Sequence, residues 1–485
     1  MDQQDNAIGA SPTMQSPPHR ALGPGYSPAE VRQSLWLIML AWLFGASFSA
    51  IVSGATLTSF LTKYLKLDDF SYGIVMASGQ AAVLFLFLGS YVNERSGRVK
   101  RNFLIFTTLH RLIWLGVAAG ALFLPGASMP VKVWVVGGVI FLSAAMANFG
   151  GGAGWIAWMS GIVPKRIAGS FFGTRASLGM ISMILTSIGV AYLLDHFATS
   201  GWIYAVVFSV AAIFGATDIL TFIPIREIPR PIEEKPPTLV DILVTPWSNA
   251  LFRHFVLYIA LAWMSYTMMG TFQWRCAFAD VKEGGLGMSL TTANLVMFIL
   301  PVITQVLSAP FWGRAIDRFG PKPVLTAGAF FSLIWPIPWL IIRPDLIWLL
   351  PIAHLFSGLL WPGNEQILTY MQLKGFPENR RTAYVATFMV TFGLACMIGA
   401  ALGGVLAVFW KDNMHWIPGL PSWVTQYHGV FLFSMLIRVS SFVFVLLPLQ
   451  LPGVAAGVGA VTREVVISGV SSLSAVNRAR KKRGK

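Results

Sequence analysis

The stretch W-G-R-A-I-D-R-F-G-P-K-P, from Trp312 to Pro323, lies between two long apolar segments in the second half of the chain. It holds two arginines, an aspartate and a lysine, although only 11% of all residues are charged. Gly320 and Pro321 within it favour a sharp turn. A short charged turn between apolar segments is typical of a water-exposed loop that joins two antiparallel membrane helices.

The composition of the whole chain supports this interpretation. Of the 485 residues, 55% are hydrophobic, and the mean hydropathy of +0.66 is far above that of soluble proteins. A helix needs about 20 mostly apolar residues to cross a bilayer. Twelve such windows occur, at residues 34–61, 72–92, 102–124, 131–158, 168–194, 201–224, 251–276, 288–312, 323–343, 346–373, 382–409 and 428–450. We therefore predict an all-α integral membrane protein with twelve transmembrane helices.

The distribution of positive charge predicts the topology. When the loops are assigned to alternate sides, most of the 35 Lys and Arg residues fall on the side that holds both termini. This predicts cytoplasmic termini and a place in the plasma (cell inner) membrane. Residues 1–33 are expected to form a disordered tail without a cleavable signal peptide. The basic run Arg478 to Lys485 suits binding to anionic lipid headgroups rather than to nucleic acid.

Several classes of function find no support in the sequence. Cys276 and Cys396 lie in different predicted helices without metal-ligand spacing, so neither a disulfide framework nor a metal site is predicted. The phosphate-binding pattern G-x-x-x-x-G-K-[ST] of ATP-driven pumps does not occur. No catalytic constellation of side chains is apparent either. We expect no cofactor and no enzymatic activity.

The opening stretch has a counterpart in the first half, S-Y-V-N-E-R-S-G-R-V-K-R, from Ser90 to Arg101. The alignment places Glu94 on Asp317, Arg95 on Arg318 and Gly97 on Gly320. Pro164 and Pro377 mark a second pair of similar loops, which follows in the same order. Repetition at about half the chain length indicates an internal duplication. We predict two pseudo-symmetric six-helix bundles, with this division of the chain: tail 1–33, first half 34–225, Pro-rich cytoplasmic linker 226–250, second half 251–450 and basic tail 451–485.

The loop pattern G-x-x-x-D-R-x-G-x-K, its variant in the first half, the twelve spans and the central linker together resemble the major facilitator superfamily. The resemblance covers residues 34 to 450 and implies a secondary transporter. In that family the loop pattern gates transport, which implies gating roles for Gly313, Asp317, Arg318 and Gly320, and for Ser90, Glu94, Arg95 and Gly97. The first copy departs from the pattern, because Ser90 stands where a glycine is expected and Gly89 lies one position earlier. The alternative is that both loops only anchor the topology.

Ionisable residues inside predicted spans are candidates for function, because they are costly in a bilayer unless paired or facing water. The candidates for coupling or intramembrane charge are His110, Arg111, Arg175, Asp218, Glu365 and Arg438. Arg175 and Asp218 are expected at a similar depth, so we predict that they pair. A structural salt bridge is favoured over a charge couple that is broken during transport.

By the same resemblance, helices 1, 4, 7 and 10 line the substrate cavity. The candidate cavity residues are Asn148, Trp155, Trp158, Tyr266, Gln273, Trp274, Trp361, Asn364, Glu365 and Gln366. Pro362 lacks a backbone donor, so carbonyl groups near residue 358 need other partners. Glu365 could pair with Arg438 or serve as a protonatable coupling site.

The leading hypothesis is alternating-access uptake of a small polar organic solute, sugar-like or an organic acid, by a monomer coupled to protons. Tryptophan faces and amides suit such a solute, because aromatic rings stack and amides form hydrogen bonds. An efflux antiporter or an uncoupled facilitator is the alternative within transport. A non-transporting membrane receptor or scaffold is the alternative of another class.

Overall fold

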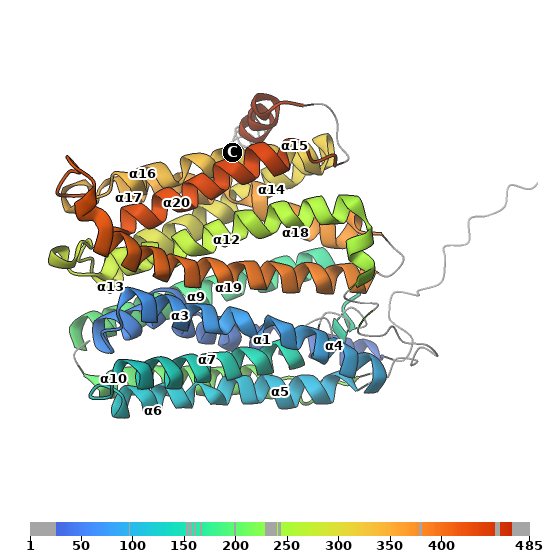
Figure 1. The fold of residues 1–485 in the computed structure, drawn as a ribbon. Coiled ribbons are helices and arrows are strands. Elements are labelled where there is room, and N and C mark those ends of the chain that lie inside the picture. The colour runs from blue at the N-terminus through green and yellow to red at the C-terminus, as the bar shows by residue number, and fades with distance from the viewer. Residues whose placement is uncertain are drawn as a thin grey trace, which may run out of the picture.

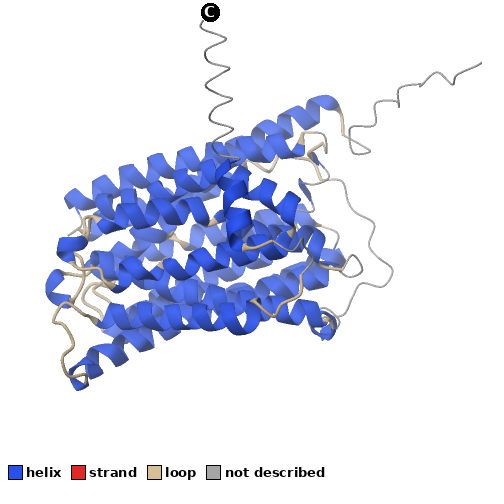
Figure 2. Ribbon diagram, turned by 90° about the horizontal axis from the view of Figure 1, so that it is seen from above, coloured by secondary structure: helices blue, strands red, loops and turns tan. Residues whose placement is uncertain are grey.

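The computed structural model describes residues 26–96, 98–151, 155, 158–159, 162–164, 167–197, 200–227, 240, 244–377, 381–451 and 456–467. Within these ranges the chain forms only helices and loops, as Figure 2 shows. The prediction of an all-helical membrane protein is confirmed.

Eleven helical stretches of the described chain are long and apolar enough to cross a membrane. They are Pro28–Tyr64, Asp69–Asn93, Val99–Phe123, Met129–Gly150, Ser170–Phe197, Gly201–Leu220, Ala250–Phe278, Leu290–Phe319, Pro321–Leu340, Ala383–Trp416 and Gln426–Leu446. The remaining predicted span, 346–373, consists of two shorter helices, α17 (Leu349–Leu360) and α18 (Pro362–Tyr370). Pro362 separates them, because it has no backbone N–H to donate.

The helices form two layers (Figure 1). The lower layer holds α1 (Pro28–Val52), α2 (Gly54–Ser59), η1 (Phe60–Tyr64), α3 (Asp69–Ala81), η2 (Ala82–Leu84), α4 (Phe85–Ser96), α5 (Val99–Ile113), α6 (Leu115–Phe123), α7 (Met129–Gly150), α9 (Ala168–Phe197) and α10 (Gly201–Leu220). The upper layer holds η3 (Thr245–Ser248), α12 (Ala250–Phe278), η4 (Val281–Glu283), α13 (Leu290–Asn294), η5 (Leu295–Ile299), α14 (Leu300–Phe319), α15 (Pro321–Ile334), α16 (Pro336–Leu340), η6 (Pro344–Leu346), α17, α18, η7 (Met371–Gly375), α19 (Arg381–Asn413), η8 (Met414–Trp416), α20 (Gln426–Ser440) and η9 (Ser441–Leu446). The layers meet mainly where α3 packs on α19 and α9 packs on α13.

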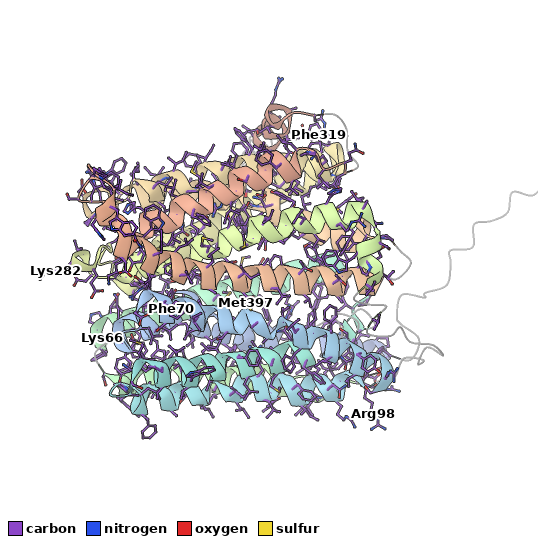
Figure 3. The ribbon with its side chains drawn as sticks, viewed as in Figure 1. Lys66, Phe70, Arg98, Lys282, Phe319 and Met397 are labelled. Carbon is purple, nitrogen blue, oxygen red and sulfur yellow. The ribbon has the colours of Figure 1, made fainter. Side chains whose placement is uncertain are left out.

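The two faces of the molecule are named here by the start of α1. The N-terminal side is the face at which α1 begins, and the opposite side is the face at which α3 and α13 begin. Figure 3 shows Lys66 and Lys282 at the opposite side and Arg98 and Phe319 at the N-terminal side. Phe70 on α3 and Met397 on α19 lie near the junction of the layers.

Helix α1 begins earlier than the predicted window, at Pro28. Ser27 accepts a hydrogen bond from the Glu30 backbone N–H, and the Glu30 carboxylate accepts one from the Ser27 N–H. This capping box satisfies backbone donors that are otherwise unpaired at the start of a helix. The expectation of a disordered tail through residue 33 is therefore wrong for its last residues.

The turn predicted at Gly320 is confirmed. Gly320 has φ 80° and ψ 176° and directly connects α14 with α15. This positive φ favours glycine, which lacks the Cβ atom that would clash. At the corresponding corner of the first half, Gly89 rather than Ser90 makes the close approach, because a Cβ atom on Gly89 would lie 2.1 Å from the Phe149 carbonyl oxygen.

Residues 458–467 form a further helix within the predicted basic tail. Val461 is fully buried in the apolar cluster that also contains Ile316 and Leu446. The Glu464 carboxylate accepts a hydrogen bond from the Arg318 guanidinium of the α14–α15 corner. This helix therefore lies against the loop for which the family resemblance implies a gating role.

Candidate functional site at the junction of the two layers

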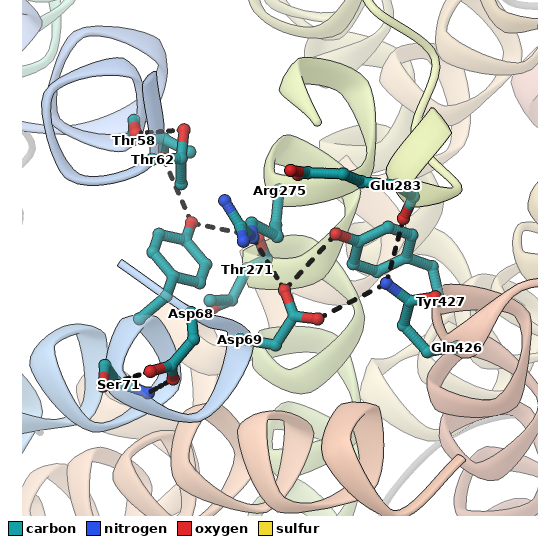
Figure 4. Close-up of polar contacts among 11 residues, drawn as sticks. Thr58, Thr62, Asp68, Asp69, Ser71, Thr271, Arg275, Glu283, Gln426 and Tyr427 are labelled. Atoms are coloured by element: carbon teal, nitrogen blue, oxygen red, sulfur yellow. Dashed lines mark hydrogen bonds and ion pairs between the residues drawn. The ribbon is translucent and has the colours of Figure 1, made fainter. Parts of the chain in front are cut away.

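A buried polar network joins the two layers at the opposite side (Figure 4). The Arg275 Nε atom, at the end of α12, donates to the Asp69 carboxylate, at the start of α3, over 2.7 Å. Asp69 also accepts from the Tyr427 hydroxyl at 3.3 Å and from the Gln426 amide at 3.4 Å. The side chains of Asp69 and Arg275 are 6% and 10% exposed. Hydrogen bonds between charged groups in such shielded places are the strong ones.

Further hydrogen bonds connect the layers on the same side. The Asp195 carboxylate at the end of α9 accepts from the backbone N–H groups of Leu290 and Thr291 at 2.7 and 2.8 Å. A carboxylate at the start of a helix such as α13 is stabilised by the helix dipole. Lys63 donates to the Met288 carbonyl at 3.0 Å. The opposite side is thus closed by contacts from three different helices of the lower layer.

The N-terminal side is different. Here the layers touch through apolar side chains, with Phe87 of α4 packed among Ala383, Ala386 and Val390 of α19. The described residues show no hydrogen bond between the layers on this side. Asp317 is exposed, and its carboxylate has no hydrogen bond or ion pair with any other described residue.

The other predicted gating residues of the loops are distributed as follows. Arg318 pairs with Glu464, and the guanidinium of Arg95 lies over the Tyr91 ring at 4.4 Å. Gly313 is not tightly packed, because a Cβ atom there would meet Gln366 only at 3.5 Å. The Glu94 side chain and Gly97 lie outside the described part of the chain.

The intramembrane aspartate of the lower layer pairs with Arg111. The Arg111 Nη2 atom lies 2.7 Å from Asp218 Oδ2, and both side chains are largely buried. Arg111 also lies over the Phe48 ring at 4.1 Å, and His110 Nδ1 lies 2.8 Å from the Ser143 hydroxyl. The prediction that Asp218 pairs with Arg175 is therefore wrong, because its partner is Arg111. Depth along a helix does not say which way a side chain points, and Arg111 on α5 is the residue directed at α10.

Arg175 has two aromatic neighbours instead. Its guanidinium carbon lies 4.2 Å from the ring centroid of Trp42 and 5.0 Å from that of Trp155. Trp155 is half-buried, whereas Trp158 is buried with Phe103 and donates to the Arg226 carbonyl. The structure thus assigns Trp158 to packing at the N-terminal side rather than to a cavity.

Asn148, the remaining candidate of α7, is half-buried. Its amide donates to the Ala144 carbonyl one turn earlier, at 2.9 Å. A local hydrogen bond of this kind leaves the amide oxygen of Asn148 available to other partners.

In the upper layer, Arg438 is buried, and no carboxylate of the described part of the chain pairs with it. Its Nε atom donates to the Ser265 hydroxyl at 2.7 Å, and its guanidinium lies over the Tyr266 ring at 4.5 Å. Glu365 instead accepts a hydrogen bond from the Gln305 amide and is exposed. In the structure Glu365 therefore does not pair with Arg438.

The carbonyl groups that lose a backbone donor at Pro362 accept hydrogen bonds from other residues, as predicted. The Ser308 hydroxyl donates to the Gly358 carbonyl at 3.4 Å, and the Trp312 indole donates to the Leu359 carbonyl at 2.9 Å. A Cβ atom on Gly363 would lie 2.6 Å from the Trp312 ring. The absence of a side chain at Gly363 therefore lets α18 pack closely on α14.

The polar side chains that follow the break contact different helices. The Asn364 amide donates to the Gly328 carbonyl of α15, and the Gln366 amide donates to the Ala309 carbonyl of α14. Trp361 lies edge-to-face with Tyr266. Only Glu365 of the three consecutive polar residues is exposed.

The two candidates at the far end of α12 differ in their surroundings. Gln273 is 5% exposed, and with its amide oriented so that the oxygen faces the indoles, it accepts hydrogen bonds from Trp335 and Trp339. Trp274 is half-buried and lies against Phe278. His354 packs edge-on against both indoles that Gln273 contacts.

Sequence reasoning missed Asp69, Gln305, Trp335 and Trp339. Asp69 lies in a run of two aspartates at the expected start of a span, which also suits simple capping. Arg275 at the end of the seventh span was the available signal, because an arginine at that depth needs a carboxylate partner.

Comparisons with known proteins agree with this architecture. The sequence model of the Major Facilitator Superfamily matches residues 281–477. A tetracycline resistance protein, class H, of Pasteurella multocida is 31% identical over 120 residues, which are 24% of this chain and 29% of that protein. The multidrug resistance protein MdtG of Salmonella typhimurium is 26% identical over 216 residues, which are 43% of this chain and 50% of that protein. The matches thus span half or less of these relatives' length.

Solved structures share the fold over nearly the whole chain. The nucleoside transporter NupG has a TM-score of 0.61 at 17% identity and matches 87% of this chain and 98% of its own. A bacterial homologue of the human lysosomal transporter Spinster, in an inward-facing and unoccupied conformation, has a TM-score of 0.63 at 13% identity and matches 87% and 97%. A D-xylose-proton symporter has a TM-score of 0.58 at 17% identity and matches 86% and 98%.

Proposed function

The chain belongs to the major facilitator superfamily, and we propose that it is a proton-coupled secondary transporter that takes up a small polar organic solute by alternating access. The solute is sugar-like or an organic acid. The N-terminal side is the cytoplasmic side in this proposal, as the positive charge of the loops favours. The protein works as a monomer in the plasma membrane.

The observation that carries the proposal is the asymmetry of the contacts between the layers. Among the described residues, every hydrogen bond between the layers lies at the opposite side, around Asp69 and Asp195. The proposed gating residue Asp317 is exposed on the N-terminal side. An alternating-access protein needs two such gates, of which no more than one is open at a time. We interpret the structure as closed to the outside.

Glu365 is the proposed coupling residue. It is a carboxylate in the tenth span that accepts a hydrogen bond from a neutral amide, Gln305, and no cation of the described residues pairs with it. A carboxylate without a fixed counter-ion can bind and release a proton as its surroundings change. Intramembrane carboxylates of this kind mark proton pathways in transporters.

Drug efflux is the second candidate. The matched relatives carry the names tetracycline resistance protein and multidrug resistance protein. The aromatic residues Trp263, Tyr266 and Trp361, which contact one another, would suit a flat apolar solute as well as a sugar.

A solute screen followed by a flux measurement tests the proposal. Purified protein is screened by thermal shift against sugars, nucleosides, organic acids and tetracycline, since a ligand that binds the folded state raises its Tm. Each stabilising solute is then tested in proteoliposomes with an imposed pH gradient. We expect accumulation of at least one solute that depends on the gradient. Binding without flux under either gradient direction would favour a receptor, and gradient-driven loss of solute would favour efflux.

A further inference from the structure

We propose that Arg175, with Trp42 and Trp155, forms a binding site for the anionic group of a small organic acid that also carries a flat apolar part. This inference rests on the proposed transport function and names the class of its solute. The three residues come from α1, from the segment that follows α7, and from α9. Helix α9 is not one of the cavity-lining helices expected from the family resemblance.

Among the described residues, no carboxylate forms an ion pair with Arg175. Asp218 is near enough to attract Arg175 electrostatically. Its Oδ2 atom, however, already accepts a hydrogen bond from Arg111 at 2.7 Å. The Arg175 Nε atom is shielded from solvent and has no hydrogen-bond partner among the described residues. Two arginines thus share one aspartate, and a net positive charge remains at Arg175.

Aromatic contacts alone do not balance that charge. A cation near an indole face gains about 0.5–2 kcal/mol, whereas removing an ion from water costs several kcal/mol. An arginine that is retained inside a span therefore indicates a water-filled path or an anionic partner. Arg175, Trp42 and Trp155 are all half-buried, so part of each side chain stays accessible to a ligand.

The surface of α9 beside Arg175 is polar and open. Thr174 and Ser177 are exposed, and no atom lies within 4 Å of the position that a Cβ on Gly173 would take. The next large exposed residues along α9 are Ile181 and Leu185, which suit lipid or apolar packing. The polar surface around Arg175 therefore gives way to an apolar surface in the middle of α9.

The chemistry of these groups selects the ligand. A guanidinium binds a carboxylate or phosphate with two parallel hydrogen bonds, which an uncharged hydroxyl cannot reproduce. Indole faces add stacking with a flat apolar group. An anionic lipid headgroup offers the same charge, so the test must separate a dissolved acid from a lipid.

The test compares 4-nitrobenzoate with uncharged 4-nitrobenzyl alcohol, because nitroaromatic rings quench indole fluorescence on contact. The full chain is titrated in uncharged detergent, and the half-quenching concentrations are compared. We expect a preference for the carboxylate of roughly 10- to 100-fold, as for a charge-assisted pair. Arg175→Gln should abolish the preference, Arg175→Lys should keep part of it, and Trp42→Phe should reduce the quenching amplitude.

Arg343→Gln is the matched control. Arg343 also lies over an indole, that of Trp423 at 6.0 Å, but it pairs with Asp345. We expect this variant to keep the wild-type preference. Arg175→Lys keeps the test informative if Arg175→Gln does not fold, because a wild-type protein without preference, or an Arg175→Lys variant with unchanged preference and affinity, overturns the site.

Nanodiscs separate the two sources of the anion. If phosphatidylglycerol in phosphatidylcholine nanodiscs displaces 4-nitrobenzoate from the wild type, the site holds a lipid headgroup and the solute assignment is overturned. If it does not, a dissolved acid is the ligand. Either result leaves alternating access standing, because that is measured at the Asp69 gate and not at Arg175.

Discussion

Neutralising Asp69 should open the opposite side of the protein. In the closed state Asp69 accepts hydrogen bonds from Arg275, Tyr427 and Gln426. Asp69→Asn keeps the shape of the side chain but removes its charge, which costs about 1.5–3 kcal/mol for a hydrogen bond to a charged group. In the open state the partners are apart and hydrated, so the substitution costs little there. The equilibrium should shift toward the open state by roughly 10- to 150-fold.

The native Cys276 reports this shift. It follows Arg275 directly and is 1% exposed, so a membrane-impermeant maleimide reaches it only after the gate opens. The measurement uses Cys396→Ser as the background, which removes the other cysteine. We expect Cys276 in Asp69→Asn to react roughly 10 to 150 times faster from outside than in the background protein.

The neighbouring carboxylate supplies a matched control. Asp68 caps α3 by accepting from the Ser71 N–H at 2.8 Å and has no hydrogen bond to the upper layer among the described residues. Asp68→Asn should therefore leave the labelling rate within about two-fold, because asparagine caps a helix about as well as aspartate does. Equal rates for Asp69→Asn and the background, in folded protein, would refute the gate.

Four further substitutions test the remaining charges. Glu365→Gln should preserve solute binding and exchange but abolish accumulation driven by a pH gradient; wild-type accumulation would make this carboxylate structural. Arg111→Gln and Asp218→Asn should each cost ~3–5 kcal/mol of stability in thermal unfolding, as for other broken buried pairs, with a coupling above ~1 kcal/mol in the double variant; a larger coupling of Asp218 to Arg175 than to Arg111 would contradict the observed pairing. Asp317→Asn should increase the population that is open to the cytoplasm, measured by cysteine accessibility; an unchanged pattern would leave this loop only a topological role.

Local features of the fold could be predicted from the sequence. The turn at Gly320 and the break at Pro362 follow from the backbone chemistry of single residues, and both occur where expected. The membrane spans follow from the length of apolar windows. These predictions needed no knowledge of how the helices pack.

Contacts between helices could not be predicted in the same way. Depth along a span put Asp218 level with Arg175, but the rotation of α5 and α9 about their axes decides which arginine faces it, and that depends on packing of the whole layer. Trp158 was expected in a cavity from its position in the fourth span, yet it packs against Phe103. The Asp69–Arg275 pair joins residues more than 200 positions apart, and nothing local to either residue specifies the other.

Distances between the two layers, measured at both faces, test alternating access itself. Spin labels replace Lys66 and Lys282 at the opposite side, and Arg98 and Lys374 at the N-terminal side, in a cysteine-free background; all four residues are exposed. Pulsed electron resonance then gives both distance distributions with and without Asp69→Asn. We predict a new population in which the Lys66–Lys282 distance lengthens while the Arg98–Lys374 distance shortens. A lengthening at one face without a shortening at the other, or no new population at all, would contradict the proposed mechanism.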